Sequence, residues 1–469
     1  MINQNILTVI EMICQVRSIS KITANLCSRS LLNLMTTENF PHMIQDNVIR
    51  CFSSIVSSSD CLESTCNLCA RAFLIISSKA QGRIRFNKKI PALEQIFGLI
   101  NVKETKTHIV ISKACFNMLG DPDSRIAAIE ARALSVLKIA ASLNNTSISE
   151  SIGQTLIVIS SDERIHKKLL KEPIIEIVLL LLSTTEGWPF ECAIQACAAF
   201  ASFPIFRATM IDKGVITSIV NCFLVGKVHD YVIGEAIARC LCFLSFVKSY
   251  CDNMITGANI MLPLNLLGLF SCSSVFTGSM VVITLRNLSS ASKFGDTMIQ
   301  QHAIRLIGNI MRSLPIDQSF PLCQSAILVM QNLAKYTSHH SLVIQEGVLM
   351  EVLLRVASII SNDDDQRDGI HIYSIYLLHL LNNLIQLYLF PIHEHTHTHT
   401  HIYIYIYILS LILFLACFDQ LDVSAIVGAM DLMSASPTTH QKIVASGVVT
   451  TFKRCIFIHS IKKKMQNAK

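Results

Sequence analysis

Three cysteines in the first part of the chain have the spacing of a metal or cluster site. Cys61, Cys66 and Cys69 follow a Cys-x4-Cys-x2-Cys pattern, which is the start of a plant-type iron–sulfur spacing. A fourth ligand is not evident, and Cys66 and Cys69 lie three residues apart on one face of an expected helix. We therefore interpret these cysteines as buried core residues, and we keep a metal- or cluster-binding protein as an alternative.

A second set of possible ligands lies in residues 393–408, where Thr-His alternation is followed by Ile-Tyr alternation. Alternate histidines from His395 to His401 would share one face of a strand, where imidazoles can bind a metal. A repeated CA dinucleotide encodes alternating Thr (ACA) and His (CAC), and a repeated AT dinucleotide encodes alternating Ile (ATA) and Tyr (TAT). We therefore interpret 385–418 as a low-complexity insertion, a translated intron. Residues 402–418 carry no charge and are long enough for a marginal membrane span. A membrane-associated protein anchored through 402–418 is the second alternative.

Two glycine-rich motifs of common enzyme classes are missing from the sequence. It contains neither the Gly-x-Gly-x-x-Gly pattern of dinucleotide sites nor the Gly-Lys-Ser/Thr loop of phosphate sites. Pairs such as Glu163 and His166 have no motif around them. We therefore predict that the protein is not an enzyme and that it has no catalytic residue, no cofactor, no metal and no small-molecule substrate.

The composition indicates a large helical protein. Of 469 residues, 51% are hydrophobic and 15% charged, while 17 Gly and 11 Pro are few for an all-β chain of this size. Apolar residues recur at three- and four-residue spacing, which is typical of helices. The formal charge of +6 is small, and Lys and Arg are scattered, so nucleic acid is not an expected partner. The run Lys462–Lys464 belongs to an expected solvated basic tail, 459–469.

The 17 cysteines indicate a reducing compartment. They lie mostly in apolar segments that are expected to be helical, where Cys behaves as a small hydrophobic residue. They do not form the paired disulfide framework of a secreted protein. Residues 1–5 also lack the basic start of a signal peptide. We expect a cytoplasmic protein, with a nuclear location as a second possibility and membrane anchoring as a minority interpretation.

A repeat of about 42 residues organises almost the whole chain. The segment around Asn33 recurs in altered form, and from Asn33 to Asn332 the equivalent anchor positions follow one another at intervals of 41 to 45 residues. The predicted anchors are Asn33, Ile75, Asn117, Val158, Ser202, Phe243, Asn287, Asn332 and, near the end, Asp431.

A second mark follows each anchor by roughly 15 residues, as at Pro91 and Gly214. Glycine accepts the left-handed backbone of a sharp corner between helices, and proline suits a first helical turn. Each repeat is therefore predicted to be a long helix that ends near the anchor, a short polar connection and a second helix. One such pair cannot bury its apolar faces alone, so neighbouring repeats must stack on one another.

The pattern resembles the armadillo repeat, in which Ala-x-x-x-Leu-x-Asn-Leu is followed by Gly-x-Ile-x-x-Leu. The clearest matches are Val282–Ser289, Ala326–Ala334 and Ser341–Leu349. The resemblance covers about 5–360 and then 420–458, and HEAT repeats are the structural alternative. It implies an all-α fold, a right-handed α-α superhelix of the armadillo/HEAT-like solenoid type.

The resemblance also implies a binding groove. In armadillo proteins the last helix of each repeat lines a concave groove, which places Asn33, Asn117, Asn287 and Asn332 there as the candidate partner-binding residues. An Asn amide can pair with both the N–H and the C=O of an extended peptide. The alternative is that these Asn side chains brace a neighbouring helix. The Trp–Asn ladder of importin-α is missing, so recognition of nuclear localisation signals is not expected.

The sequence therefore predicts a non-enzymatic scaffold or adaptor that binds extended segments of other proteins. The expected domains are 1–14, a remnant of a truncated first repeat; 15–384, about eight armadillo repeats; 385–418, the insertion; 419–458, a terminal repeat; and 459–469, the basic tail.

Overall fold

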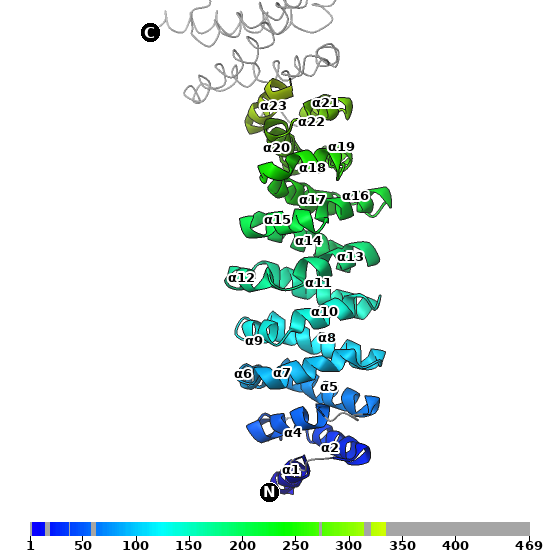
Figure 1. Ribbon diagram of the computed structural model, residues 1–469, viewed down its shortest axis with the longest axis vertical. Coiled ribbons are helices and arrows are strands. Elements are labelled where there is room, and N and C mark those ends of the chain that lie inside the picture. Colours follow the sequence, from blue (N-terminus) through cyan, green and yellow to red (C-terminus); the bar gives the residue numbers. More distant parts are fainter. Residues whose placement is uncertain are drawn as a thin grey trace, which may run out of the picture. The chain divides into compact units, whose positions relative to one another are not determined.

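The described part of the chain is helical throughout. The computed structural model describes residues 2–14, 19–36, 38–57, 62–271, 274–313 and 320–333, and every regular element within them is an α-helix or a short 3-10 helix (Figure 1). The chain consists of two compact units, Met1–Leu244 and Ser245–Lys469. The all-α prediction is confirmed for these residues, and the predictions for 385–418, 419–458 and 459–469 lie outside them.

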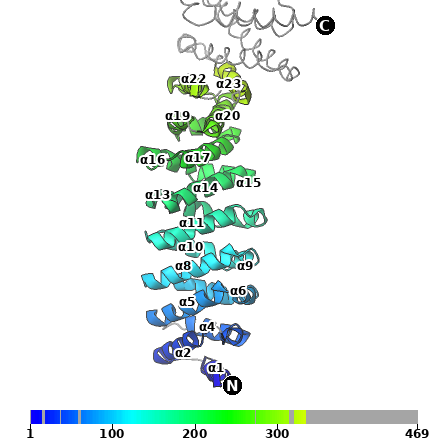
Figure 2. The ribbon, with the colours of Figure 1, turned by 180° about the vertical axis from the view of Figure 1, so that it is seen from behind.

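The long helices of the first unit form one row, in which each helix contacts the next, and Figure 2 shows this row from behind. It begins after α1 (Ile2–Cys14). The members of the row are α2 (Lys21–Asn33), α5 (Glu63–Ser78), α8 (Thr105–Gly120), α11 (Thr146–Ser160), α14 (Trp188–Ser202) and α17 (Tyr231–Leu244).

Shorter helices form a second row beside the first, and successive members of it are also in contact. These helices are α4 (Asp46–Val56), α7 (Ile90–Phe97, continued by the 3-10 helix η1, Gly98–Asn101), α10 (Ala133–Ala141), α13 (Ile174–Thr184) and α16 (Val215–Leu224). Left-handed backbone makes the corner before two of them, at Arg132 (φ 64°) and Gly214 (φ 83°). The predicted corner at Gly214 is confirmed.

The predicted short polar connection after each long helix is wrong, because this segment is itself a short helix. Its apolar side chains, such as Phe86, Leu169 and Phe206, are fully buried between the two rows, which holds the segment helical. Each repeat thus contains three helices. The short ones are α3 (Phe40–Met43), α6 (Ala80–Phe86), α9 (Arg125–Glu130), α12 (His166–Leu169, preceded by the 3-10 helix η2, Glu163–Ile165) and α15 (Pro204–Asp212).

Small side chains let the long helices approach closely. A Cβ placed on Gly153 of α11 would lie 2.9 Å from the Cβ of Cys192 in α14, closer than two such atoms normally come. Cys69 of α5 likewise lies 3.3 Å, sulfur to oxygen, from Ser28 of α2. All thirteen cysteines that the structure describes are buried, as expected for small apolar residues in a helical core.

A side chain from the short helix closes the end of each of four long helices. Arg125 donates from Nε to the carbonyl of Leu119 at 2.7 Å and from Nη2 to that of Gly120 at 3.2 Å. The last carbonyls of a helix lack partners within it and attract cations, so these bonds stabilise the end of α8. The donor side chain lies six residues after the accepting carbonyl. The same six-residue step recurs from Arg83 to the carbonyl of Ser77 (3.0 Å), from His166 to that of Ser160 (3.0 Å) and from Arg207 to that of Ala201 (2.8 Å).

This step corrects one predicted anchor. In three repeats the accepting carbonyl lies two residues after the anchor, as it does for Asn117 and Leu119. In the fifth repeat the acceptor is Ala201, so Ala199 and not Ser202 is equivalent to the other anchors. With Ala199 as the anchor, the longer interval falls after this anchor and not before it. The additional residues lie in the connection between α16 and α17.

A buried ion pair joins two successive repeats. Arg125 pairs with Asp162, and their side chains are 5% and 9% exposed. Arg164 adds two hydrogen bonds of 2.9 Å to the same carboxylate. The bonds from Arg164 and then from Arg125 hold the pKa of Asp162 well below its usual range. In the preceding repeat, Arg83 and Asp121 form the equivalent pair at 3.4 Å.

The second unit has the same order of helices within its described residues. The 3-10 helix η3 (Lys248–Tyr250) comes first, and α19 contacts α22 while α20 contacts α23. These helices are α18 (Cys251–Thr256), α19 (Met261–Phe270), α20 (Val275–Ala291), α21 (Gly295–Gln300), α22 (Ala303–Ser313) and α23 (Phe320–Leu333).

Replacing Asp162 by Asn should lower the free energy of unfolding at neutral pH by about 3 kcal/mol, because Arg125 keeps a buried charge without its partner. The contribution of Asp162 is present above the unfolded carboxyl pKa of about 3.9 and is lost as the pH falls through the lower folded value. In urea titrations, the difference between wild type and Asp162→Asn should therefore be constant above about pH 5 and shrink below about pH 4.

Asp212→Asn is the matched control, because Asp212 is exposed and its carboxylate has no ion-pair partner among the described residues. It should change stability by less than about 0.5 kcal/mol. Equal effects of the two substitutions would contradict the role given to the Arg125–Asp162 pair.

Candidate binding face

Hydrogen bonds between neighbouring long helices set their register. Asn25 of α2 donates to Thr65 of α5 at 3.1 Å, and Asn67 of α5 donates to Thr107 of α8 at 3.2 Å. The two bonds are the same contact one repeat apart. Residues separated by one repeat therefore occupy equivalent places on successive helices.

Burial of both flanks leaves one line of exposed or half-buried side chains on each long helix. This line contains the anchor and the residue one helical turn before it. We call the resulting surface of the first unit the open face. It consists of Arg29 and Asn33 (α2), Arg71 and Ile75 (α5), Lys113 and Asn117 (α8), Gln154 and Val158 (α11), Gln195 and Ala199 (α14), and Arg239 and Phe243 (α17).

The predicted Asn residues of the first unit lie on this face in two different states. Asn33 is exposed at the end of α2, and its side chain makes no hydrogen bond with the described residues. Asn117 is half-buried, and its Nδ2 donates to the Oγ of Ser77 on α5 at 3.2 Å. Asn117 therefore contacts the neighbouring helix, and whether it also binds a peptide stays a prediction.

Asn287 and Asn332 make the same contact within the second unit. Asn287 donates to the Oγ of Ser245 at 2.9 Å, and Asn332 donates to the Oγ of Ser289 at 3.2 Å. In each case the acceptor is a serine two residues after the preceding anchor, a signal present in the sequence that went unnoticed. An amide has two N–H groups and a carbonyl, so the one bond made by Asn117 or Asn287 leaves capacity for a ligand.

The open face also has apolar and aromatic members. Ile75 and Val158 are half-buried in the line, and Phe243 lies under the guanidinium of Arg207, 5.5 Å from the ring centroid. The single tryptophan, Trp188, is 49% exposed at the start of α14, outside the anchor positions. The face thus offers apolar surface between polar residues.

Three cations lie in register at one end of the open face. Arg29, Arg71 and Lys113 are each exposed, occupy equivalent positions on α2, α5 and α8, and have no ion-pair partner among the described residues. Along the sequence, by contrast, Lys and Arg are scattered. The three cations would have been found by comparing residues four before each anchor, one repeat apart.

The two thiols of the predicted cluster site that the structure describes are core residues. Cys66 and Cys69 are buried in α5, whereas Cys61 lies outside the described residues. Burial raises the pKa of Cys69 to about 12, which disfavours the thiolate that a metal requires. Within the described ranges, no group of three or more His, Cys, Asp or Glu side chains has the geometry to hold a metal ion.

The other candidate segments lie beyond residue 333. They are the histidines from His395 to His401 and residues 402–418. The sequence His393–His397, which overlaps the first of these, matches the His-Glu-x-x-His pattern of metalloproteases. Before residue 334, no single described helix has the length and apolar composition of a membrane span. One pair, Lys248–Thr256 with Met261–Phe270, reaches them together but is bent by 89°.

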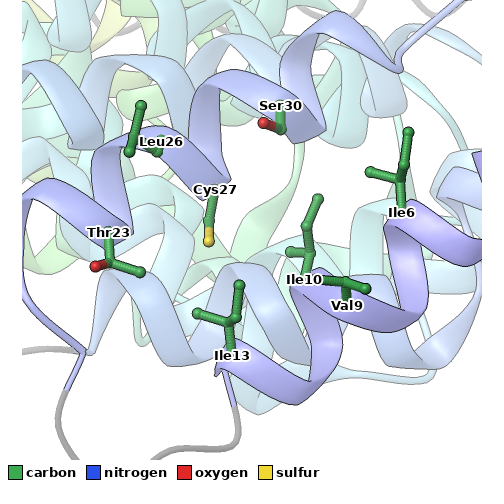
Figure 3. A pocket seen from close by; sticks show the side chains of 8 residues that line it. All are labelled: Ile6, Val9, Ile10, Ile13, Thr23, Leu26, Cys27 and Ser30. Atoms are coloured by element: carbon green, nitrogen blue, oxygen red, sulfur yellow. The ribbon is translucent and has the colours of Figure 1, made fainter.

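An apolar groove of about 420 Å³ lies between α1 and α2 (Figure 3). On α2 it is lined by residues that include Thr23 and Cys27. Their equivalents on α5, Thr65 and Cys69, are fully buried at the contact with α2. The groove is lined by Ile6, Val9, Ile10, Ile13, Thr23, Leu26, Cys27 and Ser30.

A smaller hollow of about 270 Å³ at the corner before α13 contains two carboxyl groups with opposite shifts. Burial raises the pKa of Glu172, while hydrogen bonds from Lys138 and Lys213 lower that of Glu176. Glu176 accepts from Lys213 at 2.9 Å and also from Lys138. These bonds connect three successive repeats, so ion pairing between repeats accounts for the charges of Glu176, Lys138 and Lys213.

Comparison with known proteins assigns no family to the chain. No protein-family model matches it, and neither does any curated protein sequence. Solved structures similar to it include three engineered proteins of the Northeast Structural Genomics Consortium. One is 16% identical, with a TM-score of 0.46 over 86% of this chain and 98% of its own. The others are 19% and 18% identical, with TM-scores of 0.39 and 0.38, over 53% and 51% of this chain and 98% of their own.

Replacing Asn117 by Ala should lower the free energy of unfolding by about 0.5–1.5 kcal/mol, because one hydrogen bond between α8 and α5 is lost. Asn33→Ala is the matched control on the same face, and we expect a change below about 0.5 kcal/mol for this exposed side chain. Urea denaturation followed by circular dichroism measures both. If the two variants are equally stable, Asn117 does not brace the row.

Proposed function

We propose that this chain is a non-enzymatic scaffold whose open face binds an extended segment of another protein. The observation that carries the proposal is the register of the six long helices, which lines up equivalent, accessible side chains from Asn33 to Phe243. Along this line Asn33 and Asn117 are polar, whereas the other four anchor positions are apolar. Such a surface suits a partner that lies across the helices and contacts each in turn.

The spacing of the helices supports an extended partner. Packed helices are about 8–10 Å apart. A polyproline-type chain has three residues per turn and rises about 3.1 Å per residue, so every third side chain recurs on one side after about 9.3 Å. One residue in three of the partner would thus meet each successive helix. Ile75 and Val158 would take apolar side chains, and Asn33 and Asn117 would pair with the partner's backbone.

We further propose the armadillo-type, right-handed superhelical arrangement that the resemblance implies. Support comes from the three-helix repeat, the two rows of contacting helices and the left-handed corner at Gly214. A cytoplasmic location and the absence of enzymatic activity remain predictions from the sequence. The membrane-associated alternative concerns 402–418, beyond the described residues, and the cluster-binding alternative is disfavoured by the buried thiols of Cys66 and Cys69.

Selection of 12- to 16-residue peptides from a displayed library on the full chain tests the proposal. Peptides selected on the wild type should bind Val158→Glu at least tenfold more weakly, because a charge then occupies the middle of the open face. Circular dichroism and the midpoint of urea unfolding would show that this variant is folded.

The control is Leu224→Glu, which places the same charge at the end of α16, where Leu224 is 66% exposed outside the open face. Binding to this variant should equal binding to the wild type. Peptides that bind Val158→Glu normally, or that are lost in Leu224→Glu instead, would show that the open face is not the binding surface.

A further inference from the structure

We propose that the α2–α5–α8 end of the open face recognises an acidic extended segment, with acidic side chains at every third residue. This inference rests on the proposed function and specifies the chemistry of the partner. The feature behind it is the line of Arg29, Arg71 and Lys113, one exposed cation on each of three adjacent helices.

The three cations are free to bind a ligand. The exposed groups have no ion-pair or hydrogen-bond partner among the described residues, unlike Arg83 and Arg125, which are bonded to carbonyls and carboxylates. One turn before each cation the side chain is uncharged: Asn25, Asn67 and Ile109. Like charges one repeat apart repel one another weakly, and a ligand with carboxylates at that spacing would relieve the repulsion.

The opposite end of the open face has the opposite charge pattern. In α11 and α14 the equivalents of the cations are neutral, Gln154 and Gln195, and one turn earlier stand Glu150 and Glu191. On α17, Arg239 is already paired with Glu235 at 3.1 Å. The first unit therefore presents a cationic end, formed by α2, α5 and α8, followed by acidic positions on α11 and α14.

This charge division favours a peptide over a nucleic acid. A single-stranded nucleic acid carries a negative charge on every nucleotide, so a strand continuing along the face would meet Glu150 and Glu191. A peptide can be acidic where it crosses α2–α8 and neutral or basic where it crosses α11 and α14. Asn33 and Asn117, one turn after Arg29 and Lys113, also provide amide groups that match a peptide backbone.

The test uses the full chain and three fluorescein-labelled nonapeptides at low ionic strength, with fluorescence anisotropy as the readout. The first peptide is Glu-Ala-Pro repeated three times. The second has the same composition with its three Glu residues adjacent, and the third has Lys in place of Glu. We expect the spaced acidic peptide to bind at least fivefold more tightly than the block peptide, and the Lys peptide to bind more weakly than both.

Variants locate the interaction. Arg71→Gln and Lys113→Gln should each weaken binding of the spaced acidic peptide at least threefold. Arg85→Gln removes the same charge from an exposed position on α6 and should leave binding unchanged. Because Arg71 and Lys113 are exposed and form no ion pair with the described residues, these variants are expected to fold, and circular dichroism verifies it.

Three results would overturn the inference. They are no preference for the spaced over the block peptide, equal losses in Arg85→Gln and Arg71→Gln, and tighter binding of a labelled ten-nucleotide oligothymidylate that is lost in the same two variants. The last result would assign the cations to nucleic acid. If library peptides that depend on Val158 still bind while acidic peptides do not, the proposed function stands and its acidic specificity fails.

Discussion

The packing of each long helix between two equivalent neighbours is the constraint on which the rest of the structure depends. Gly153, Cys69 and Ser28 show how small the side chains at these contacts are, and Asn25 and Asn67 show that the same hydrogen bond is repeated one helix further on. When both flanks of a helix are buried, the remaining side chains form a narrow line. Stacking then brings equivalent residues of successive repeats together, which is how a one-dimensional repeat in sequence becomes a surface.

Polar groups stabilise this packing at the helix ends. Arg125 bonds the last carbonyls of α8 and also pairs with Asp162 of the next repeat, so a single side chain holds a helix end and the junction between repeats. His166 and Arg207 occupy the same place in the following repeats. The Asn anchors fit the same scheme, because Asn117 donates to Ser77 of the preceding long helix. Anchor residues that are predicted to bind a partner therefore also stabilise the packing of the helices. The exposed charged side chains lie one turn before the anchors, at Arg29, Arg71 and Lys113.

The sequence predicted much of this architecture and less of the site. Helical class, the period and the corner at Gly214 follow from local patterns of apolar residues and glycine, which depend on neighbours in the chain. The short helices were missed because their helical state depends on burial of Phe86, Leu169 and Phe206 between two rows, a tertiary effect. The anchor at Ser202 was placed three residues late, because the constant step is set by a hydrogen bond from Arg207 and not by residue type. The cationic line required knowledge of which residues on each helix remain exposed.

We propose that a partner segment lies along the open face and crosses the long helices in order. Photo-crosslinking tests it most directly, with benzoylphenylalanine in place of Gln154, Gln195 or Leu224 in the full chain and a peptide selected for tight binding as the target. We expect efficient crosslinks from 154 and 195 to positions about three residues apart in the peptide, and none from 224. Crosslinks from 224, or from 154 and 195 to the same peptide residue, would contradict it.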